Sequence, residues 1–180
     1  PGHEELKEIF ANTPNLIGIQ KVVGNPINPP PVLAEKGQVG ANDLIFDGDN
    51  RIRRGLIYFN DPEGNTVYSF AIYLALQYLQ SKGIAPEVIE GTDNWKLGKS
   101  TLIPLEANDG GYVRTDAGGF QVLINYQGGN NHFRMVSVTD VLTDQVKNEQ
   151  GQLDPDWGKD QVILIGNVGE SANDYFFTPY

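Results

Sequence analysis

The stretch RIRRGLIYFNDPEGNTVYSFAIYLALQYLQSKG, residues 51–83, joins an arginine-led apolar segment to a turn and then to a long apolar run. The turn, DPEGN at 61–65, holds residue types that tight turns require, because proline fixes φ while glycine and asparagine tolerate positive φ. A second set of turn residues, DGDN at 47–50, precedes the arginines. We therefore predict an antiparallel hairpin in this part of the chain.

Beyond the turn, Val67 to Lys82 carries apolar side chains at helical spacing, and Gly83 stands where a left-handed residue caps a helix. These side chains fall on two faces, with Phe70, Leu74 and Tyr78 on one and Ile72, Ala75 and Leu79 on the other. A helix that is apolar on two faces is packed on more than one side. We expect it to be the core helix.

Two shorter helices are predicted near the ends of the chain. One covers residues 3–12, with Pro14 marking its end, and the other begins after Ser137, which precedes Asp140 by three residues as in a capping box. The proline-rich stretch NPINPPP, residues 25–31, predicts an extended surface crossing, because its prolines remove backbone donors.

Apolar runs predict strands at 15–23 and 120–126, and the unbroken run at 161–166 predicts a central strand covered on both faces. Residues 91–111 predict short strands on long loops. Helices mixed with such strands indicate the α/β class, with a mixed central sheet, helices packed on it and antiparallel hairpins.

The composition limits the classes of function. With 180 residues, of which 39% are hydrophobic, the chain can bury one core, so we expect a single domain over residues 1–180. A formal net charge of −10 repels phosphate backbones, so no nucleic-acid partner is expected. The absence of cysteine excludes disulfides, thiolate metal sites and a cysteine nucleophile.

A glycine-containing turn, Gly166 to Gly169, follows the last apolar run, where a phosphate-binding loop would stand. A P-loop requires G-x-x-x-x-G-K-[ST], but counted from Gly166 its second glycine is replaced by Ser171 and its lysine by Ala172. We interpret the segment as a tight exit from a strand and expect no nucleotide or other cofactor.

Metal and catalytic motifs are weak. Residues 47–50 place oxygen donors together, yet Ile52 stands where a calcium loop needs glycine, so a turn is the better interpretation. Of the two histidines, His3 and His132, only the second lies away from the end of the chain. His132 with Asp140 and a serine, or a pair of carboxylates, leaves a hydrolase or lyase as an alternative.

The basic residues Arg51, Arg53 and Arg54 form one cluster in an acidic chain. On a strand, Arg51 and Arg53 would point to one face and Arg54 to the other. Two roles are open: edge charges paired with nearby aspartates, which we favour, and ligands for an anion.

Three stretches, taken together, resemble a known family: RIRRGLIYFNDPEGNTVYSFAIYLALQYL at 51–79, FQVLINYQG at 120–128 and GKDQVILIGNVGESANDYFFTPY at 158–180. Their order also fits, with an "SF…LAL" helix, an "INY" strand, a "VTDVL" helix and a "VILIG…S…D.F.TP" finish. Over essentially its whole length the chain resembles the CHASE domain of the second type.

The resemblance implies an extracytoplasmic sensor of a bacterial membrane protein, anchored by transmembrane helices, with an adenylate or guanylate cyclase, histidine kinase or Ser/Thr kinase as output. The family's opening portion has no counterpart, so we expect the later portion of a larger sensor domain. Residues at the family's recurrent polar positions are the candidate ligand-binding set: Arg53, Arg54, Ser171, Asn173 and Asp174. The spacing of Ser171 and Asp174 also fits a helix cap, the interpretation we favour.

Three hypotheses follow for function. The first is a non-catalytic sensor at the periplasmic face of the bacterial inner membrane, biased by a small-molecule or protein signal. The others are a hydrolase or lyase using carboxylates with His132, and a protein-interaction module using residues 25–31. We count a homodimer among the partners to be tested.

Overall fold

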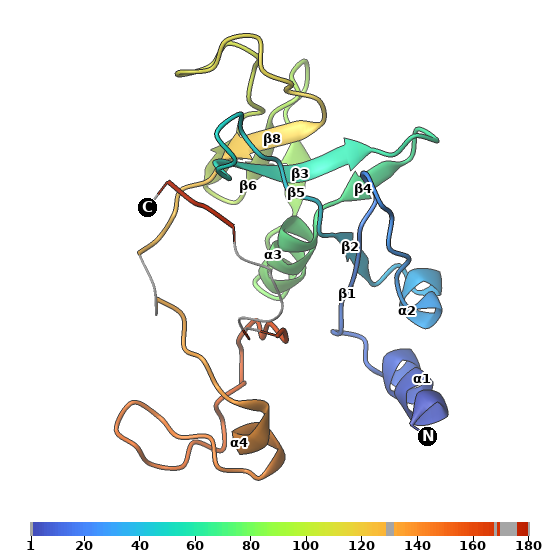
Figure 1. Ribbon diagram of the computed structural model, residues 1–180, viewed down its shortest axis with the longest axis vertical. Helices are drawn as coiled ribbons and strands as arrows, with labels where there is room; N and C mark the ends of the chain where they lie inside the picture. Colours follow the sequence, from blue (N-terminus) through green and yellow to red (C-terminus); the bar gives the residue numbers. More distant parts are fainter. Residues whose placement is uncertain (1, 129–131, 168, 170–175, 180) are drawn as a thin grey trace. The chain divides into compact units, whose positions relative to one another are not determined.

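The computed structural model of the chain describes residues 2–128, 132–167, 169 and 176–179 (Figure 1). The described residues fall into two compact units, one of residues 2–124 with 176–179 and the other of residues from 125 to 169. The elements are α1 (His3–Asn12), β1 (Gly18–Gln20), α2 (Pro31–Glu35), β2 (Val39–Ala41), β3 (Arg54–Asn60), β4 (Thr66–Tyr68), α3 (Phe70–Gln80), β5 (Pro86–Val88), β6 (Trp95–Leu97), β7 (Ser100–Leu102), β8 (Phe120–Leu123) and α4 (Val138–Leu142).

In the described part of the chain the strands form three small sheets, with orders β1-β2, β4-β3-β8 and β5-β6-β7. The β1-β2 pair is parallel, whereas all pairs in the other two sheets are antiparallel. This combination confirms the predicted α/β class with antiparallel hairpins. No helix among the described residues is long and apolar enough to cross a membrane.

The predicted hairpin is formed by β3 and β4. Its turn closes where the Asp61 carboxylate accepts a hydrogen bond from the Asn65 N–H at 2.7 Å. Gly64 has φ of 87°, a left-handed conformation that glycine adopts without strain. The residue types at 61–65 therefore specify this turn locally.

The other edge of β3 pairs with β8 through a β-bulge. Leu56 lies opposite Gln121 and Tyr58 lies opposite Phe120, so Ile57 is an extra residue on β3. A bulge of this kind shifts which side chains of a strand face inward. Ahead of the bulge Ile52 and Arg54 are buried, whereas Ile57, in the bulge, and Phe59, after it, are buried.

Helix α3 begins three residues later than predicted, because Thr66–Tyr68 pair with β3 as β4. The Ser69 hydroxyl caps the helix by accepting a hydrogen bond from the Ile72 N–H at 3.3 Å. Gly83 ends it with φ of 73°, which confirms the predicted cap. Its packing is less complete than predicted, since Ala75 and Tyr78 are exposed.

The core of the first unit joins α3 to the two antiparallel sheets. Its buried members are Ile57, Ile72, Trp95 and Phe120. The Phe120 and Trp95 rings meet edge to face with centroids 5.6 Å apart, a favourable aromatic geometry. Burial of these large side chains fixes the side of α3 that lies against the sheet.

The N-terminal part of this unit packs against α3 through β2. Gly40 of β2 lies so close to the start of α3 that a Cβ there would be 2.5 Å from the Phe70 Cα. The predicted first helix is confirmed as α1, and the strand predicted at 15–23 is realised only as β1. The prolines predict an extended crossing, so α2 was not predicted. It begins at Pro31, because proline is tolerated at the first position of a helix.

The other predictions for the first unit hold with shorter bounds. Residues 91–111 contain β6 and β7 on loops, as predicted. Of the strand predicted at 120–126, only β8 forms, and Leu123 is already 56% exposed. The strand ends at Leu123 because its partner there, Arg54, is the first residue of β3, although the apolar run continues to Tyr126.

The second unit contains α4, which the Ser137 hydroxyl caps by accepting a hydrogen bond from the Asp140 N–H at 3.0 Å, as predicted. The prediction of a central strand at 161–166 is wrong: these residues are not in a strand, and Ile165 is 88% exposed. An apolar run meets one requirement of a buried strand, but a neighbouring strand must also take up its backbone hydrogen bonds. No strand lies among the described residues of this unit.

Candidate functional site

A tight turn precedes β3 and places two carboxylates beside the arginines. The Asn50 N–H donates to the Asp47 carbonyl at 2.9 Å, and Asn50 has φ of 59°. The Asp47 N–H donates to the Arg51 carbonyl at 2.9 Å, which folds the chain back on itself. The turn interpretation of residues 47–50 is thus confirmed.

Arg53 binds both aspartates of this turn. Its Nη1 donates to Asp47 Oδ2 and to Asp49 Oδ1, each at 2.8 Å, and its Nη2 donates to Asp49 Oδ2 at 2.7 Å. The paired bonds to Asp49 have the fork-to-fork geometry that suits guanidinium and carboxylate groups.

Arg54, the first residue of β3, is buried with its charge compensated. Its Nε donates to Asp47 Oδ1 at 2.9 Å, and its Nη1 donates to the Asp116 carbonyl and to Gln121 Oε1 at 2.8 and 2.9 Å. Its guanidinium carbon lies 5.1 Å from the centroid of the Tyr112 ring. Four residues therefore converge on one side chain.

The electrostatics of the cluster favour the ionised carboxylates. Burial alone would raise the pKa of Asp47, but hydrogen bonds from the two guanidinium groups and the Tyr112 hydroxyl lower it overall. The hydrogen bonds from Arg53 lower the pKa of the exposed Asp49 to about 2. Burial, reinforced by the bond to Asp47, raises the pKa of Tyr112.

The structure thus brings Arg53 and Arg54 together on the two oxygens of one carboxylate. The premise that they point to opposite faces of one strand is wrong, because β3 begins only at Arg54. Pairing with aspartates is confirmed for both, although Arg54 is buried rather than solvated. Their role as ligand-binding residues stays a prediction.

Arg51 connects this cluster to the segment 176–179, which lies beside it despite the distance in sequence. Its Nη1 donates to the Thr178 carbonyl, and the Ile52 N–H donates to the Phe177 carbonyl at 2.9 Å. A parallel bridge joins Arg51 and Phe177. The cluster at the start of β3 therefore holds a strand-like segment from the C-terminal end.

The remaining candidates from the sequence are three residues near the C-terminal end and His132. Ser171, Asn173 and Asp174, with the helix cap suggested for them, lie outside the described residues. His132, in the second unit, is exposed and packs edge to face on Phe133, with ring centroids 5.2 Å apart. Within the described residues, no group of three or more His, Cys, Asp or Glu side chains suits a metal ion.

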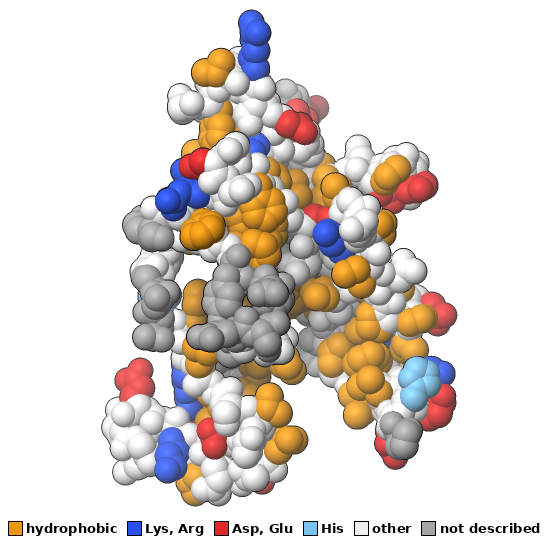
Figure 2. All heavy atoms as spheres, viewed as in Figure 1, with side chains coloured by type: hydrophobic (Ala, Val, Ile, Leu, Met, Phe, Trp, Pro, Cys, Tyr) orange, Lys and Arg blue, Asp and Glu red, His pale blue; other side chains and the backbone are white. Residues whose placement is uncertain are grey.

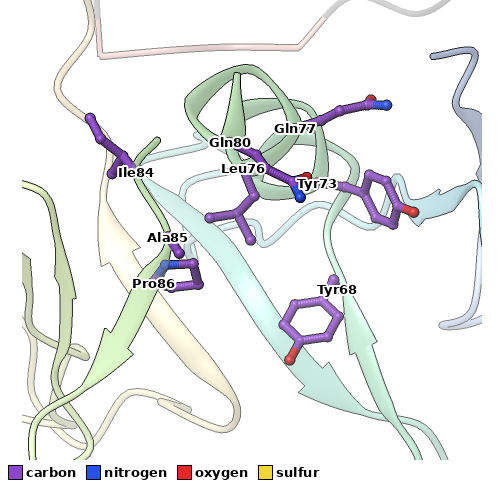
Figure 3. Close-up of a pocket in the computed structure, with 8 residues that line it drawn as sticks. All are labelled: Tyr68, Tyr73, Leu76, Gln77, Gln80, Ile84, Ala85 and Pro86. Atoms are coloured by element: carbon purple, nitrogen blue, oxygen red, sulfur yellow. The ribbon is translucent and has the colours of Figure 1, made fainter. Parts of the chain in front are cut away.

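A second candidate site, which sequence reasoning missed, is a cleft of about 430 Å³ in the first unit between α3, β4 and the chain leading into β5 (Figure 3). Leu76 points from α3 into the space between the Tyr68 ring and Pro86 (Figure 3). Its lining residues are Tyr68, Tyr73, Leu76, Gln77, Gln80, Ile84, Ala85 and Pro86. Those at 73, 76, 77 and 80 follow the i, i+3, i+4, i+7 spacing of one helix face, a signal that could have indicated it.

The surface carries no concentrated basic patch on the face seen in Figure 2, where lysine and arginine side chains are scattered. This distribution agrees with the net charge of −10. Anionic polymers therefore find no complementary surface on that face.

The sequence profile of the CHASE2 domain matches residues 2–180. The chain belongs to the CHASE2 domain family, an extracellular sensory domain family of signalling proteins rather than a catalytic one, which confirms the resemblance. No curated protein and no solved structure matches the chain.

Proposed function

We propose that the chain is the signal-input domain of a membrane-bound bacterial signalling protein and lies at the periplasmic face of the inner membrane. Both compact units belong to one ectodomain in this proposal, since the family match spans residues 2–180. Transmembrane helices link the domain to a cyclase, histidine kinase or Ser/Thr kinase inside the cell. A homodimer would bring two such outputs together.

The observation that carries this mechanism is the pairing of residues 176–179 with the chain just ahead of β3. The Ile52 N–H bonds the Phe177 carbonyl, and Arg51 bonds the Thr178 carbonyl. A stimulus that binds one arrangement of β3 more tightly than another shifts the population between them. The segment 176–179 moves with that shift and passes it to the chain that follows.

Two experiments test this function. Reporter fusions after residue 180 in the natural reading frame, one active only outside and one only inside the cytoplasm, locate the domain. We expect the extracytoplasmic reporter to be active. Reading the frame beyond the chain should reveal membrane spans and a cyclase or kinase. An active cytoplasmic reporter, or a frame that encodes neither spans nor output, contradicts the proposal.

The two alternative functions gain no separate support. No hydrogen bond joins His132 to an acid or a serine among the described residues, and the ring contacts Phe133 instead. In the proline-rich strip, Ile27 pairs with Lys21 through backbone bonds of 2.9 and 3.1 Å, so part of its backbone is already engaged. Both remain hypotheses.

A further inference from the structure

The cleft beside α3 has the size of a ligand site. Its volume of about 430 Å³ lies within the ~300–1,000 Å³ typical of small-molecule pockets. All of its lining residues lie between Tyr68 and Pro86 and so belong to the first unit. The site is thus complete within one unit.

The lining determines the charge of a suitable occupant. Two tyrosine rings and four aliphatic side chains supply most of it, two glutamines supply amides, and none of the eight residues is charged. Moving an ion from water into such surroundings is costly without a paired charge. An uncharged molecule with a flat apolar body therefore fits best.

Two polar groups at the cleft are available to such a molecule. Tyr73 already donates its hydroxyl proton to the Gly37 carbonyl, and the Gln77 amide reaches the Pro14 carbonyl at 3.4 Å. In contrast, neither the Gln80 amide nor the Tyr68 hydroxyl forms a hydrogen bond with any described residue. An amide offers both a donor and an acceptor, so it recognises a ligand amide or hydroxyl.

The cleft is also joined to the core of the sensor. The Tyr68 ring lies 6.1 Å from that of Tyr58 on β3 and 6.2 Å from that of Trp95, centroid to centroid. Tyr58 and Trp95 stack at 5.6 Å. A flat ring placed against Tyr68 would extend this aromatic group and contact the side of β3. Just ahead of β3, Ile52 binds the segment 176–179 through its N–H.

We propose that this cleft is the stimulus site of the domain and that its ligand is a small uncharged molecule with an aromatic ring and an amide or hydroxyl group. The proposal rests on the sensory function proposed above and adds the class of ligand. The ring packs between Tyr68 and Leu76, and the Gln80 amide bonds the polar group.

The test compares three probes that share a ring and differ in charge: benzamide, benzoate and benzamidinium. Calorimetry and saturation-transfer NMR on the whole chain measure their binding. We expect benzamide to bind at least about tenfold more tightly than either ion, because the ions lose hydration without gaining a partner. Equal affinity for the three probes overturns the proposal.

Two variants locate the binding. Ala85→Trp fills the cleft from an exposed position and should abolish benzamide binding, whereas Ala75→Trp, an exposed position of α3 outside the cleft, should not. Gln80→Leu keeps the side-chain size and should weaken benzamide several-fold, with an unchanged circular dichroism spectrum. Unchanged binding by Ala85→Trp or Gln80→Leu overturns the cleft proposal. Those results leave the reporter experiment unaffected, so the two proposals fail separately.

Discussion

Arg54 and Asp47 form a buried ion pair, with Nε 2.9 Å from Oδ1 and side chains that are 5% and 8% exposed. This pair holds the turn at 47–50 against the first residue of β3. Gln121 joins it from β8, so it also fixes the polar end of the sheet. Breaking one partner of such a pair leaves the other charge buried without compensation.

Asp47→Asn should therefore lower the free energy of unfolding by about 3 kcal/mol, because Arg54 loses its buried counterion. Urea denaturation measures this change. The matched control is Asp49→Asn, which removes a carboxylate that is 51% exposed and pairs only at the surface. The control should lose much less, and equal losses would show that burial of the pair contributes nothing.

Stability should fall on acidification, since the pKa of Asp47 and that of Asp49 are both lowered in the folded chain. A lowered carboxyl pKa contributes stability that is fully present above the ordinary value of 3.8 and is lost as pH falls toward the folded value, about 2 for Asp49. Melting temperatures recorded between pH 6 and pH 2 measure this loss of stability. Arg53→Gln should flatten this dependence, because Arg53 bonds both carboxylates. If the melting temperature of the variant falls with pH as steeply as that of the unchanged protein, Asp47 and Asp49 do not cause the loss of stability.

Gly40→Ala should destabilise the first unit by at least about 2 kcal/mol, in the range of overpacking strain. A Cβ at this position would meet the Phe70 backbone at 2.5 Å, so β2 and α3 must separate. Gly48→Ala is the control, because nothing lies within 4 Å of its Cβ position and its φ is not positive. Thermal unfolding measures both, and a tolerated Gly40→Ala would mean that β2 and α3 are not in contact.

Arg51→Ala should loosen the segment 176–179 with little change in overall stability. The bond from Arg51 to the Thr178 carbonyl disappears, so the neighbouring bond from the Ile52 N–H to the Phe177 carbonyl opens more often. Hydrogen exchange at the Ile52 amide should accelerate several-fold. Arg114→Ala, which alters an exposed loop residue, should leave that rate unchanged. An unchanged exchange rate in Arg51→Ala would show that the Arg51 bond does not stabilise the pairing of the segment 176–179.

Local signals in the sequence predicted the local structure. The residue types at 61–65, Gly83 and Ser137 act on backbone bonds within a few residues, so the hairpin turn, the end of α3 and the start of α4 followed from them. The strand predicted at 161–166 failed because pairing depends on a partner that apolar character does not reveal.

The arginine cluster depends on contacts between distant parts of the chain. The sequence indicated that Arg53 and Arg54 would meet aspartates, but it could not show that Arg54 is buried against Gln121, 67 residues away. The cleft lies within residues 68–86, and the spacing of positions 73, 76, 77 and 80 indicates one face of a helix, but spacing alone does not show that part of that face stays open. Its walls come from β4, from one face of α3 and from the chain ahead of β5, and only folding places them together.

Because of the extra residue at Ile57, the alternation of buried and exposed side chains along β3 shifts by one position at the bulge. Ile52, just ahead of the strand, and Arg54 are buried at its arginine end, whereas Ile57 and Phe59 are buried at its aromatic end. Removing one residue here would restore strict alternation, so either the ion pair or the apolar core would turn toward water. The bulge is thus what allows a single strand to bury a charged pair at one end and an apolar core at the other.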